Sequence, residues 1–326
     1  MKTAIFHVKK SGLLTTIQDV GRVGYQQYGI VVSGAMDNFA HRIGNLLVGN
    51  DPTAATLEVT MMGPEIRVLD DTVIAITGAD LSATIDGRAV RPWRSIYAKK
   101  GQTLAFGQPK HGVRAYIAVA GGINCNEVLG SKATYLKANM GGIDGREIRK
   151  GDILSCGEMN ASHKKLSGRV LSPEIIPNYT SGKPFRVIVG PDHHAFTEKG
   201  LTTFFNEWYA ITREVDRMGC RLSGTVIEHR EEADILSDAI TVGTIQVPAS
   251  GQPIVLLADR QTSGGYTRIG TVITTDIPRL VQQMPGTKIS FEKISVEKAQ
   301  QLYRRQEKNM KLLKIATNTK LSKSLL

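Results

Sequence analysis

The chain has 326 residues, 41% of them hydrophobic and 22% charged, which is the composition of a globular protein of roughly two domains. No apolar run approaches the roughly 20 residues of a membrane-spanning helix, and the first ten residues lack the apolar stretch of a signal peptide. Three scattered cysteines, Cys125, Cys156 and Cys220, form no CxxC pair, so we expect a reducing, cytoplasmic location and no bound metal.

The formal net charge of +11 is concentrated at the carboxyl-terminal end. From residue 298 onward eight Lys or Arg stand against Glu307 alone, which leaves about +4 for the rest of the chain. A nucleic-acid-binding protein usually spreads basic residues over a face with interleaved aromatic residues. We therefore expect a basic helical tail over 298–326 and no nucleic-acid partner.

Short segments of alternating apolar and polar residues, separated by glycine and proline turns, predict a mostly β protein with a few helices. Strand patterns occur at 65–69, 72–76, 114–119, 185–189, 244–247 and 288–291. Helices are predicted over 36–47, near 202–208 and from Ser295 to Leu313. The Ser-, Lys-, Gly- and Pro-rich stretch 162–179 predicts a linker between β-rich subdomains 1–165 and 166–297, which the tail follows.

A first polar cluster lies near the amino terminus and comprises Gln18, Asp19, Arg22, Ser33 and Asp37. Asp19 and Arg22 have the spacing of an ion pair within a turn, and Ser33 or Asp37 is suited to cap the helix that begins near residue 36. Neither role uses the Gln18 amide, so substrate binding stays open for this cluster.

Glycine pairs at 121–122 and 141–142 follow predicted strands in the same half. Paired glycines form either turns or anion-binding concavities, and we favour turns in a glycine-rich β protein. The phosphate-loop pattern GxxxxGK[ST] is absent. On another predicted strand, Glu58 is either an inward-facing general base or an exposed residue.

Two polar clusters lie in the second half. In the first, Asp216 stands beside Arg217 and Arg221, which either clamp a carboxylate or phosphate or form a buried ion pair. The second follows the apolar strand 253–257 and comprises Asp259, Arg260, Gln261, Thr262, Ser263, Gly264, Gly265 and Tyr266. A guanidinium, an amide and hydroxyls beside a glycine pair indicate either an anion-binding loop or an ordinary polar hairpin.

Taken in order, these motifs resemble one known family. The resemblance is carried by 12–22 (GLLTTIQDVGR), 32–37 (VSGAMD), 45–50 (NLLVGN), 116–123 (YIAVAGGI), 216–219 (DRMG) and 258–266 (ADRQTSGGY). The chain resembles the family of the 5-oxoprolinase C subunit, whose members are also called KipI antagonist or KipA-like proteins. It is similar to allophanate hydrolase subunit 2 and to part of the carboxyltransferase region of urea carboxylase. The similarity covers roughly residues 5–297.

The resemblance implies two cyclophilin-like β-barrel subdomains and a component of an ATP-dependent 5-oxoprolinase, which opens 5-oxoproline to L-glutamate. The partners it implies are a KipI-like B subunit of that enzyme and an A subunit of the LamB/YcsF type, with Mg-ATP shared with a partner. Covalent biotin is not expected on this chain because the segment Ala-Met-Lys-Met is absent. Two alternatives stay open: a biotin-dependent carboxyltransferase using carboxybiotin supplied in trans, and a non-catalytic regulator that binds a KipI-like histidine kinase inhibitor.

The same resemblance assigns roles to the polar clusters. The catalytic residues it implies are Asp259, Arg260, Gln261, Arg217 and Asp19. The substrate-binding residues are Gln18, Arg22, Ser33, Asp37, Asp216, Arg221, Thr262, Gly264, Gly265 and Tyr266. ATP-driven lactam opening develops negative charge, so we expect arginines to hold carboxylate or phosphate and the glycines to supply backbone N–H donors. Asp259 or Asp19 is expected to orient an arginine or to act as a base.

Overall fold

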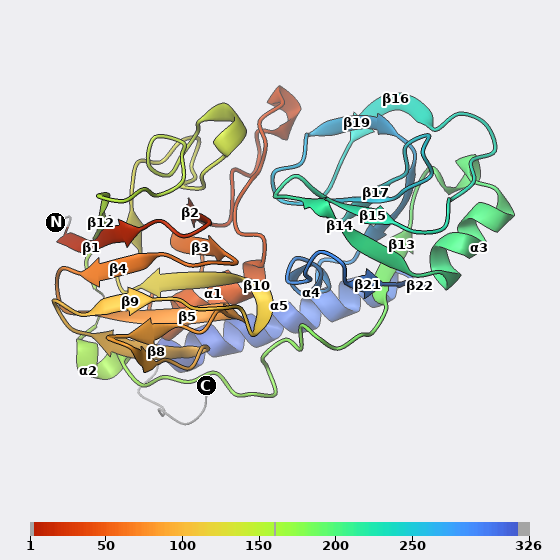
Figure 1. The fold of residues 1–326 in the computed structure, drawn as a ribbon. Coiled ribbons are helices and arrows are strands. Elements are labelled where there is room, and N and C mark those ends of the chain that lie inside the picture. The colour runs from red at the N-terminus through yellow and green to blue at the C-terminus, as the bar shows by residue number, and fades with distance from the viewer. Residues whose placement is uncertain (1–2, 160, 319–326) are drawn as a thin grey trace. The chain divides into compact units, whose positions relative to one another are not determined.

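The fold is mostly β with a few helices, as predicted (Figure 1). The computed structural model describes residues 3–159 and 161–318. The chain forms two compact units. Unit 1 holds the described residues of Met1–Arg22, Ser33–Asn178 and Asn309–Leu326, and unit 2 consists of Val23–Val32 and Tyr179–Lys308. Within the described ranges no helix is both long enough and apolar enough to cross a membrane.

Unit 1 contains two antiparallel sheets that enclose one hydrophobic core. The 7-stranded sheet has the order β11 (Ile123–Asn124), β12 (Ile153–Cys156), β1 (Thr3–Lys10), β4 (Glu65–Val68), β9 (Thr103–Ala105), β6 (Thr84–Ile85), β7 (Arg88–Ala89). The 5-stranded sheet has the order β2 (Leu14–Gln18), β3 (Thr56–Thr60), β10 (His111–Val119), β5 (Thr72–Asp80), β8 (Arg94–Ala98). Alternate residues of both sheets, such as Phe6, Leu57 and Ile117, fill the core, which explains the alternating pattern in the sequence.

Helix α1 (Asn38–Leu47) covers the other face of the 5-stranded sheet, where it contacts β5, β8 and β10. Of the two predicted capping residues, Asp37 is the cap: its Oδ1 accepts a hydrogen bond from the Ala40 N–H at 2.9 Å. Gly44 lies against β5, where a Cβ would come within 2.9 Å of Thr77 Oγ1. A glycine at this position therefore lets the helix lie close to the sheet.

The connecting stretch 162–179 packs on unit 1 over much of its length. It begins with the short helix α2 (His163–Leu166) and then runs along β8. The Gly168 N–H bonds to the Ser95 carbonyl at 3.1 Å, and the Leu171 N–H bonds to the Trp93 carbonyl at 3.0 Å. Leu166 and Leu171 are buried, so this part of the predicted linker is packed against unit 1.

Unit 2 is built on one strongly curved sheet. The 8-stranded sheet has the order β21 (Lys288–Ile289), β14 (Tyr209–Val215), β15 (Gly219–Ser223), β18 (Ile254–Leu256), β17 (Thr244–Gln246), β20 (Arg268–Val272), β13 (Phe185–Val189), β22 (Phe291–Lys293). Only Ser290 separates β21 from β22, yet these strands lie at opposite edges. The sheet must therefore curl into a nearly closed barrel. A 2-stranded ribbon of β16 (Asp234–Ala239) and β19 (Ser263–Tyr266) accompanies it.

The helices of unit 2 are short apart from the last. Helix α3 (Glu198–Asn206) accounts for the helical pattern predicted near 202–208, and Thr197 caps it by accepting the Gly200 N–H at 2.9 Å. Helix α4 (Ile277–Leu280) follows β20. Single 3-10 turns occur at η1 (Gln26–Tyr28) and η3 (His193–Ala195) in this unit and at η2 (Leu136–Ala138) in unit 1.

Helix α5 (Val296–Asn318) confirms the predicted carboxyl-terminal helix and extends it by five residues beyond Leu313. Ser295 caps it by accepting the Lys298 N–H at 3.3 Å. The helix is not a fully solvated tail, because Met310 and Leu313 are buried. Residues 319–326 of the predicted tail lie outside the described residues.

Candidate functional site

The residues implied by the resemblance fall into one group in each unit. Unit 1 holds Gln18, Asp19, Arg22, Ser33 and Asp37. Unit 2 holds Asp216, Arg217, Arg221, Asp259, Arg260, Gln261, Thr262, Gly264, Gly265 and Tyr266. Because the two groups belong to separate units, each has its own geometry.

In unit 2, backbone pairing beyond the end of β18 brings Arg217 to Asp259. The Leu257 N–H bonds to the Met218 carbonyl and the Asp259 N–H bonds to the Arg217 carbonyl, both at 2.8 Å. Arg217 then donates from Nε to Asp259 Oδ2 at 2.9 Å and from Nη2 to Oδ1 at 3.0 Å. The side chains are only 7% and 6% exposed. This two-point contact is a buried ion pair, which the sequence left as one of two alternatives, and it fixes the Asp259 side chain in the turn that precedes Arg260.

Arg260 differs from Arg217 in the groups that surround its charge. Its Nε donates to the Ile240 carbonyl at 3.3 Å and its Nη1 to the Leu257 carbonyl at 3.2 Å. In the described part of the chain no carboxylate forms an ion pair with it. Burial lowers the pKa of Arg260, although a guanidinium stays charged at neutral pH. A half-buried cation that contacts only carbonyl dipoles is suited to bind an anion.

The glycine pair after Arg260, for which the sequence left an anion-binding loop and a polar hairpin open, lies within a strand and not at a turn. Gly264 and Gly265 belong to β19, which pairs with β16 in the register Asp238↔Gly264, and neither glycine has a positive φ. A Cβ on Gly264 would lie 2.4 Å from Ile240 Cδ1 and 2.8 Å from Gln246 Nε2. The glycine is required because these side chains cross directly over the strand.

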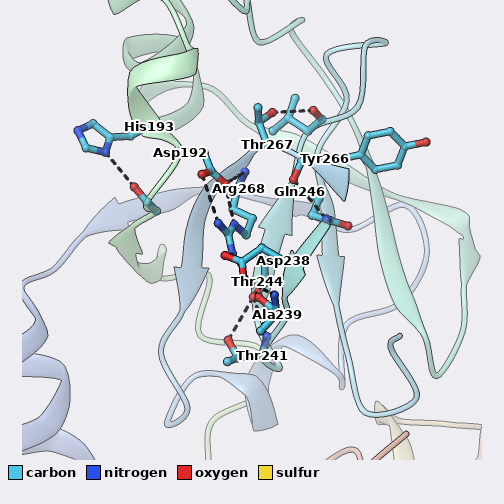
Figure 2. Close-up of polar contacts among 12 residues, drawn as sticks. Asp192, His193, Asp238, Ala239, Thr241, Thr244, Gln246, Tyr266, Thr267 and Arg268 are labelled. Atoms are coloured by element: carbon cyan, nitrogen blue, oxygen red, sulfur yellow. Dashed lines mark hydrogen bonds and ion pairs between the residues drawn. The ribbon is translucent and has the colours of Figure 1, made fainter. Parts of the chain in front are cut away.

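Sequence reasoning missed Gln246, although its side chain lies beside Gly264 and Tyr266 of β19. It is on β17, it is 2% exposed, and its Nε2 donates to the Tyr266 carbonyl at 3.3 Å (Figure 2). The Gln261 amide nitrogen lies 3.4 Å from the position of a Cβ on Gly264. Two side-chain amides therefore lie close to the same residue of β19. The only sequence signal for Gln246 was an amide inside a strand pattern.

Arg268 anchors the β16–β19 ribbon to the barrel. Its Nε donates to Asp192 Oδ2 at 2.6 Å and its Nη1 to Asp238 Oδ2 at 2.8 Å, so Arg268 lies between the two carboxylates (Figure 2). The hydrogen bond from Arg268 to Asp192 is the main reason why the pKa of Arg268 is raised. Because Asp238 is on β16, this contact positions the ribbon that carries Gly264.

Four other predicted residues of unit 2 make local contacts. Asp216 accepts the Met218 and Gly219 N–H groups at 2.7 and 3.0 Å in the turn from β14 to β15. Arg221 is exposed and lies 3.2 Å from Glu214, opposite the start of β18, whereas Arg260 follows the end of that strand. Arg217, by contrast, is buried against Asp259, so the structure does not join Arg217 and Arg221 in one clamp. The Thr262 carbonyl accepts the Ile240 N–H at 3.0 Å, and Tyr266 is exposed.

In unit 1, the predicted residues converge on the backbone between Val128 and Thr134. Gln18 Nε2 and Ser33 Oγ both donate to the Thr134 carbonyl, at 3.0 and 3.1 Å. Asp19 accepts the Ser131 hydroxyl at 2.7 Å and the Lys132 N–H at 2.6 Å. Arg22 donates to the carbonyls of Val128 and Ala133. These long-range contacts bring the predicted group together at the start of α1.

Glu58 adds a buried carboxylate beside this group. Its Oε2 accepts the Tyr116 hydroxyl and the Met36 N–H, both at 2.8 Å. Glu58 is only 2% exposed, so the exposed-residue alternative is wrong. Burial and the charge of Glu58 raise the pKa of Tyr116 well above its usual value. The Tyr116 hydroxyl also accepts the Asp37 N–H at 2.7 Å, which connects the carboxylate to the helix cap.

His41 on α1 was also missed in the sequence. Its Nδ1 lies 2.9 Å from Thr56 Oγ1 on β3, and burial lowers its pKa to about 4 despite the opposing charges of Asp19 and Glu58. His41 is therefore neutral at neutral pH. Two buried atoms, His41 Nε2 and Gln18 Oε1, have no hydrogen-bond partner among residues 3–159 and 161–318.

Comparison with known proteins gives a consistent result. Residues 28–293 match the family described as carboxyltransferase domain, subdomain A and B. The chain is 38% identical over 290 residues to the 5-oxoprolinase C subunit of Escherichia coli (strain K12), which covers 89% of this chain and 91% of that protein. It is 31% identical over 318 residues to urea amidolyase of Saccharomyces cerevisiae, which covers 93% of this chain and 17% of that protein.

Solved structures extend the similarity to the fold. The crystal structure of the Kluyveromyces lactis urea carboxylase matches with a TM-score of 0.85 at 28% identity, covering 99% of this chain and 30% of that one. The match therefore spans both units. On these grounds the chain belongs to the carboxyltransferase domain family, subdomains A and B.

Proposed function

We propose that this chain is the C subunit of an ATP-dependent 5-oxoprolinase, which opens 5-oxoproline to L-glutamate. The observation that carries the proposal is Arg260, a half-buried guanidinium with no carboxylate partner in the described ranges, in the segment that follows β18. The similarity to the C subunit of the E. coli 5-oxoprolinase, along nearly the whole length of that protein, supports the choice of reaction.

The reaction gives this site a specific task. Water adds its oxygen to the lactam carbonyl carbon, the ring C–N bond breaks, and the freed nitrogen takes up a proton. ATP activates the carbonyl by transferring its γ-phosphoryl group to the carbonyl oxygen with release of ADP, and the phosphate leaves after water has added. The groups that the site must bind are therefore the substrate carboxylate and this phosphoryl group. Both are anions that a planar guanidinium binds through two N–H groups, and Arg260 is the residue that we assign to this contact. The Arg217–Asp259 pair holds the backbone on which Arg260 stands.

The proposal includes partner subunits. A KipI-like B subunit together with an A subunit of the LamB/YcsF type completes the enzyme, and Mg-ATP is shared with a partner. The word subunit in the names of the relatives from E. coli and Haemophilus influenzae supports the view that the active protein is an assembly.

The second candidate function is a carboxyltransferase that uses carboxybiotin supplied in trans. It is favoured by the family match and by the likeness to urea carboxylase along 99% of this chain. Arg260 serves this reaction as well, because a carboxyl group in transfer is also an anion. The first function consumes 5-oxoproline and ATP and the second consumes carboxybiotin, so an assay of substrate consumption separates them.

Glutamate formation from 5-oxoproline and ATP tests the proposal in the complex co-purified with its KipI-like and LamB/YcsF-type partners. Arg260→Gln should lower kcat/KM by about 100-fold or more, since one donor to a developing anion has roughly this effect. Arg213→Gln, which changes an exposed arginine on β14, is the matched control and should retain activity. Full activity of the Arg260→Gln complex would refute the role of Arg260 in binding the reacting anion. No turnover by the assembled wild-type complex would favour the second function, with carboxybiotin as the next substrate.

A further inference from the structure

The amides of Gln246 and Gln261 both lie close to Gly264 of β19. Both Nε2 atoms lie within 3.4 Å of the position that a Cβ on Gly264 would occupy. They come from different parts of unit 2, since Gln246 is on β17 and Gln261 is in the turn before β19. The glycine lets both amides approach the backbone of the ribbon.

The two amides differ in how much of their hydrogen-bonding capacity the protein uses. Gln246 is buried and donates to the Tyr266 carbonyl at 3.3 Å. The Gln261 side chain is half-buried and makes no hydrogen bond to any described residue. A carboxamide offers two donors and a carbonyl acceptor, so Gln261 presents unused donors and an unused acceptor beside a second amide.

Ile240 connects this amide pair to the cationic group described above. Its Cδ1 lies 2.4 Å from the Cβ position of Gly264, while its carbonyl accepts Arg260 Nε at 3.3 Å. Its N–H bonds to the Thr262 carbonyl at 3.0 Å. Ile240 therefore lies next to Gly264, near which both amides lie, and also accepts a hydrogen bond from the Arg260 guanidinium.

We propose that Gln261, supported by Gln246, binds the cis-amide edge of a lactam or cyclic urea, while Arg260 binds a carboxylate on the same ligand. A cis amide presents its N–H and C=O on one edge, and a carboxamide presents the complementary C=O and N–H, so the two form a pair of parallel hydrogen bonds. The choice of a lactam as the natural ligand depends on the proposed function. The complementarity of the amide does not depend on it, because a cyclic urea offers the same edge.

Direct binding to the purified full-length chain tests this inference without turnover. The probes are 5-oxoproline, 2-pyrrolidone as a lactam without a carboxylate, 2-imidazolidinone as a cyclic urea, and L-proline, which has the ring and carboxylate but no ring carbonyl. Affinity is measured by titration calorimetry or by NMR of the side-chain amide protons. We expect 5-oxoproline to bind more tightly than L-proline, and both carboxylate-free probes to shift the Gln261 amide signal.

The variants then separate the amide from the guanidinium. Gln261→Leu should weaken 5-oxoproline binding at least about tenfold, because it removes two hydrogen bonds. Arg260→Gln should weaken 5-oxoproline but not 2-pyrrolidone. Gln300→Leu, on the exposed surface of α5, is the matched control and should bind as wild type. Gly264→Ala, whose methyl group would displace the Gln246 amide, should also weaken binding of both lactams.

Unchanged 5-oxoproline affinity in a folded Gln261→Leu protein would overturn the inference, as would a wild-type chain that binds none of the lactam and urea probes. Folding of each variant is checked by circular dichroism and thermal denaturation. A complex that turns over 5-oxoproline normally with Gln261→Leu would overturn the amide role and leave the proposed function standing. Lactam binding that depends on Gln261, in a complex without turnover, would support the amide role and refute the proposed function.

Discussion

His41 should make the stability of this protein depend on pH in a way that one substitution removes. The imidazole is fully buried between α1 and β3, and burial lowers its pKa from the usual 6.5 to about 4. Between these values the unfolded chain binds a proton at this residue and the folded chain does not. The contribution of His41 to stability is therefore intact above pH 6.5 and is lost as the pH falls toward 4.

The size of the effect follows from the two pKa values. They differ by about 2.5 pH units, and each unit corresponds to 1.36 kcal/mol, so wild type should lose roughly 3 kcal/mol through this residue between pH 6.5 and 4. Asn in place of His41 keeps a polar group near Thr56 but does not titrate. The His41→Asn protein should therefore show a flatter dependence of unfolding free energy on pH in this interval.

Urea denaturation at several pH values between 4 and 7.5 measures this difference. His111→Asn, which changes an exposed histidine at the start of β10, is the control and should follow the wild-type curve. NMR titration of the His41 ring gives its pKa independently. Parallel curves for wild type and His41→Asn, or a His41 pKa near 6.5, would refute the argument from burial.

Two further changes test the ion pairs. Asp259→Ala removes the carboxylate that contacts the buried Arg217 guanidinium and should lower the unfolding free energy by about 3–5 kcal/mol. Asp216→Ala, on the neighbouring exposed turn, should have a much smaller effect. Similar unfolding free energies for the two variants in urea denaturation would contradict this. Lys314→Met removes an exposed partner of Asp51 and should change stability by no more than about 1 kcal/mol. Hydrogen bonds from Lys314 and Thr53 outweigh the effect of partial burial and lower the pKa of Asp51 to about 2. This pKa should rise in the Lys314→Met variant. An NMR titration of Asp51 that shows no rise would count against the contact with Lys314.

The sequence predicted most of the regular structure because its signals are local. Alternation in 65–69 and 114–119 corresponds to β4 and β10, and the cap at Asp37 needs only the residues of its own helix. The glycines at 264 and 265 look like a turn by the same local rules. They form a strand because they pair with β16, which lies earlier in the chain, and residue 264 is a glycine because Ile240 and Gln246 cross over it.

The candidate sites were predicted only as separate clusters. Gln18 and Ser33 meet at the carbonyl of Thr134, more than 100 residues away, and a backbone carbonyl leaves no mark in residue types. Gln246 and His41 were missed because each lies in a segment whose apolar neighbours define the pattern. Arg217 and Asp259, by contrast, were both noted, but only the pairing of β15 with β18 brings them into contact.

The barrel of unit 2 has a consequence for synthesis on the ribosome. Its two edge strands, β21 and β22, are among the last strands to be made, so a nascent chain cannot complete the barrel before residue 293 has emerged. One contact of unit 1 forms even later, because Arg169 donates a hydrogen bond at 3.0 Å to the carbonyl of Thr317, which is synthesised after residue 293. Both units should therefore reach their final state late in translation.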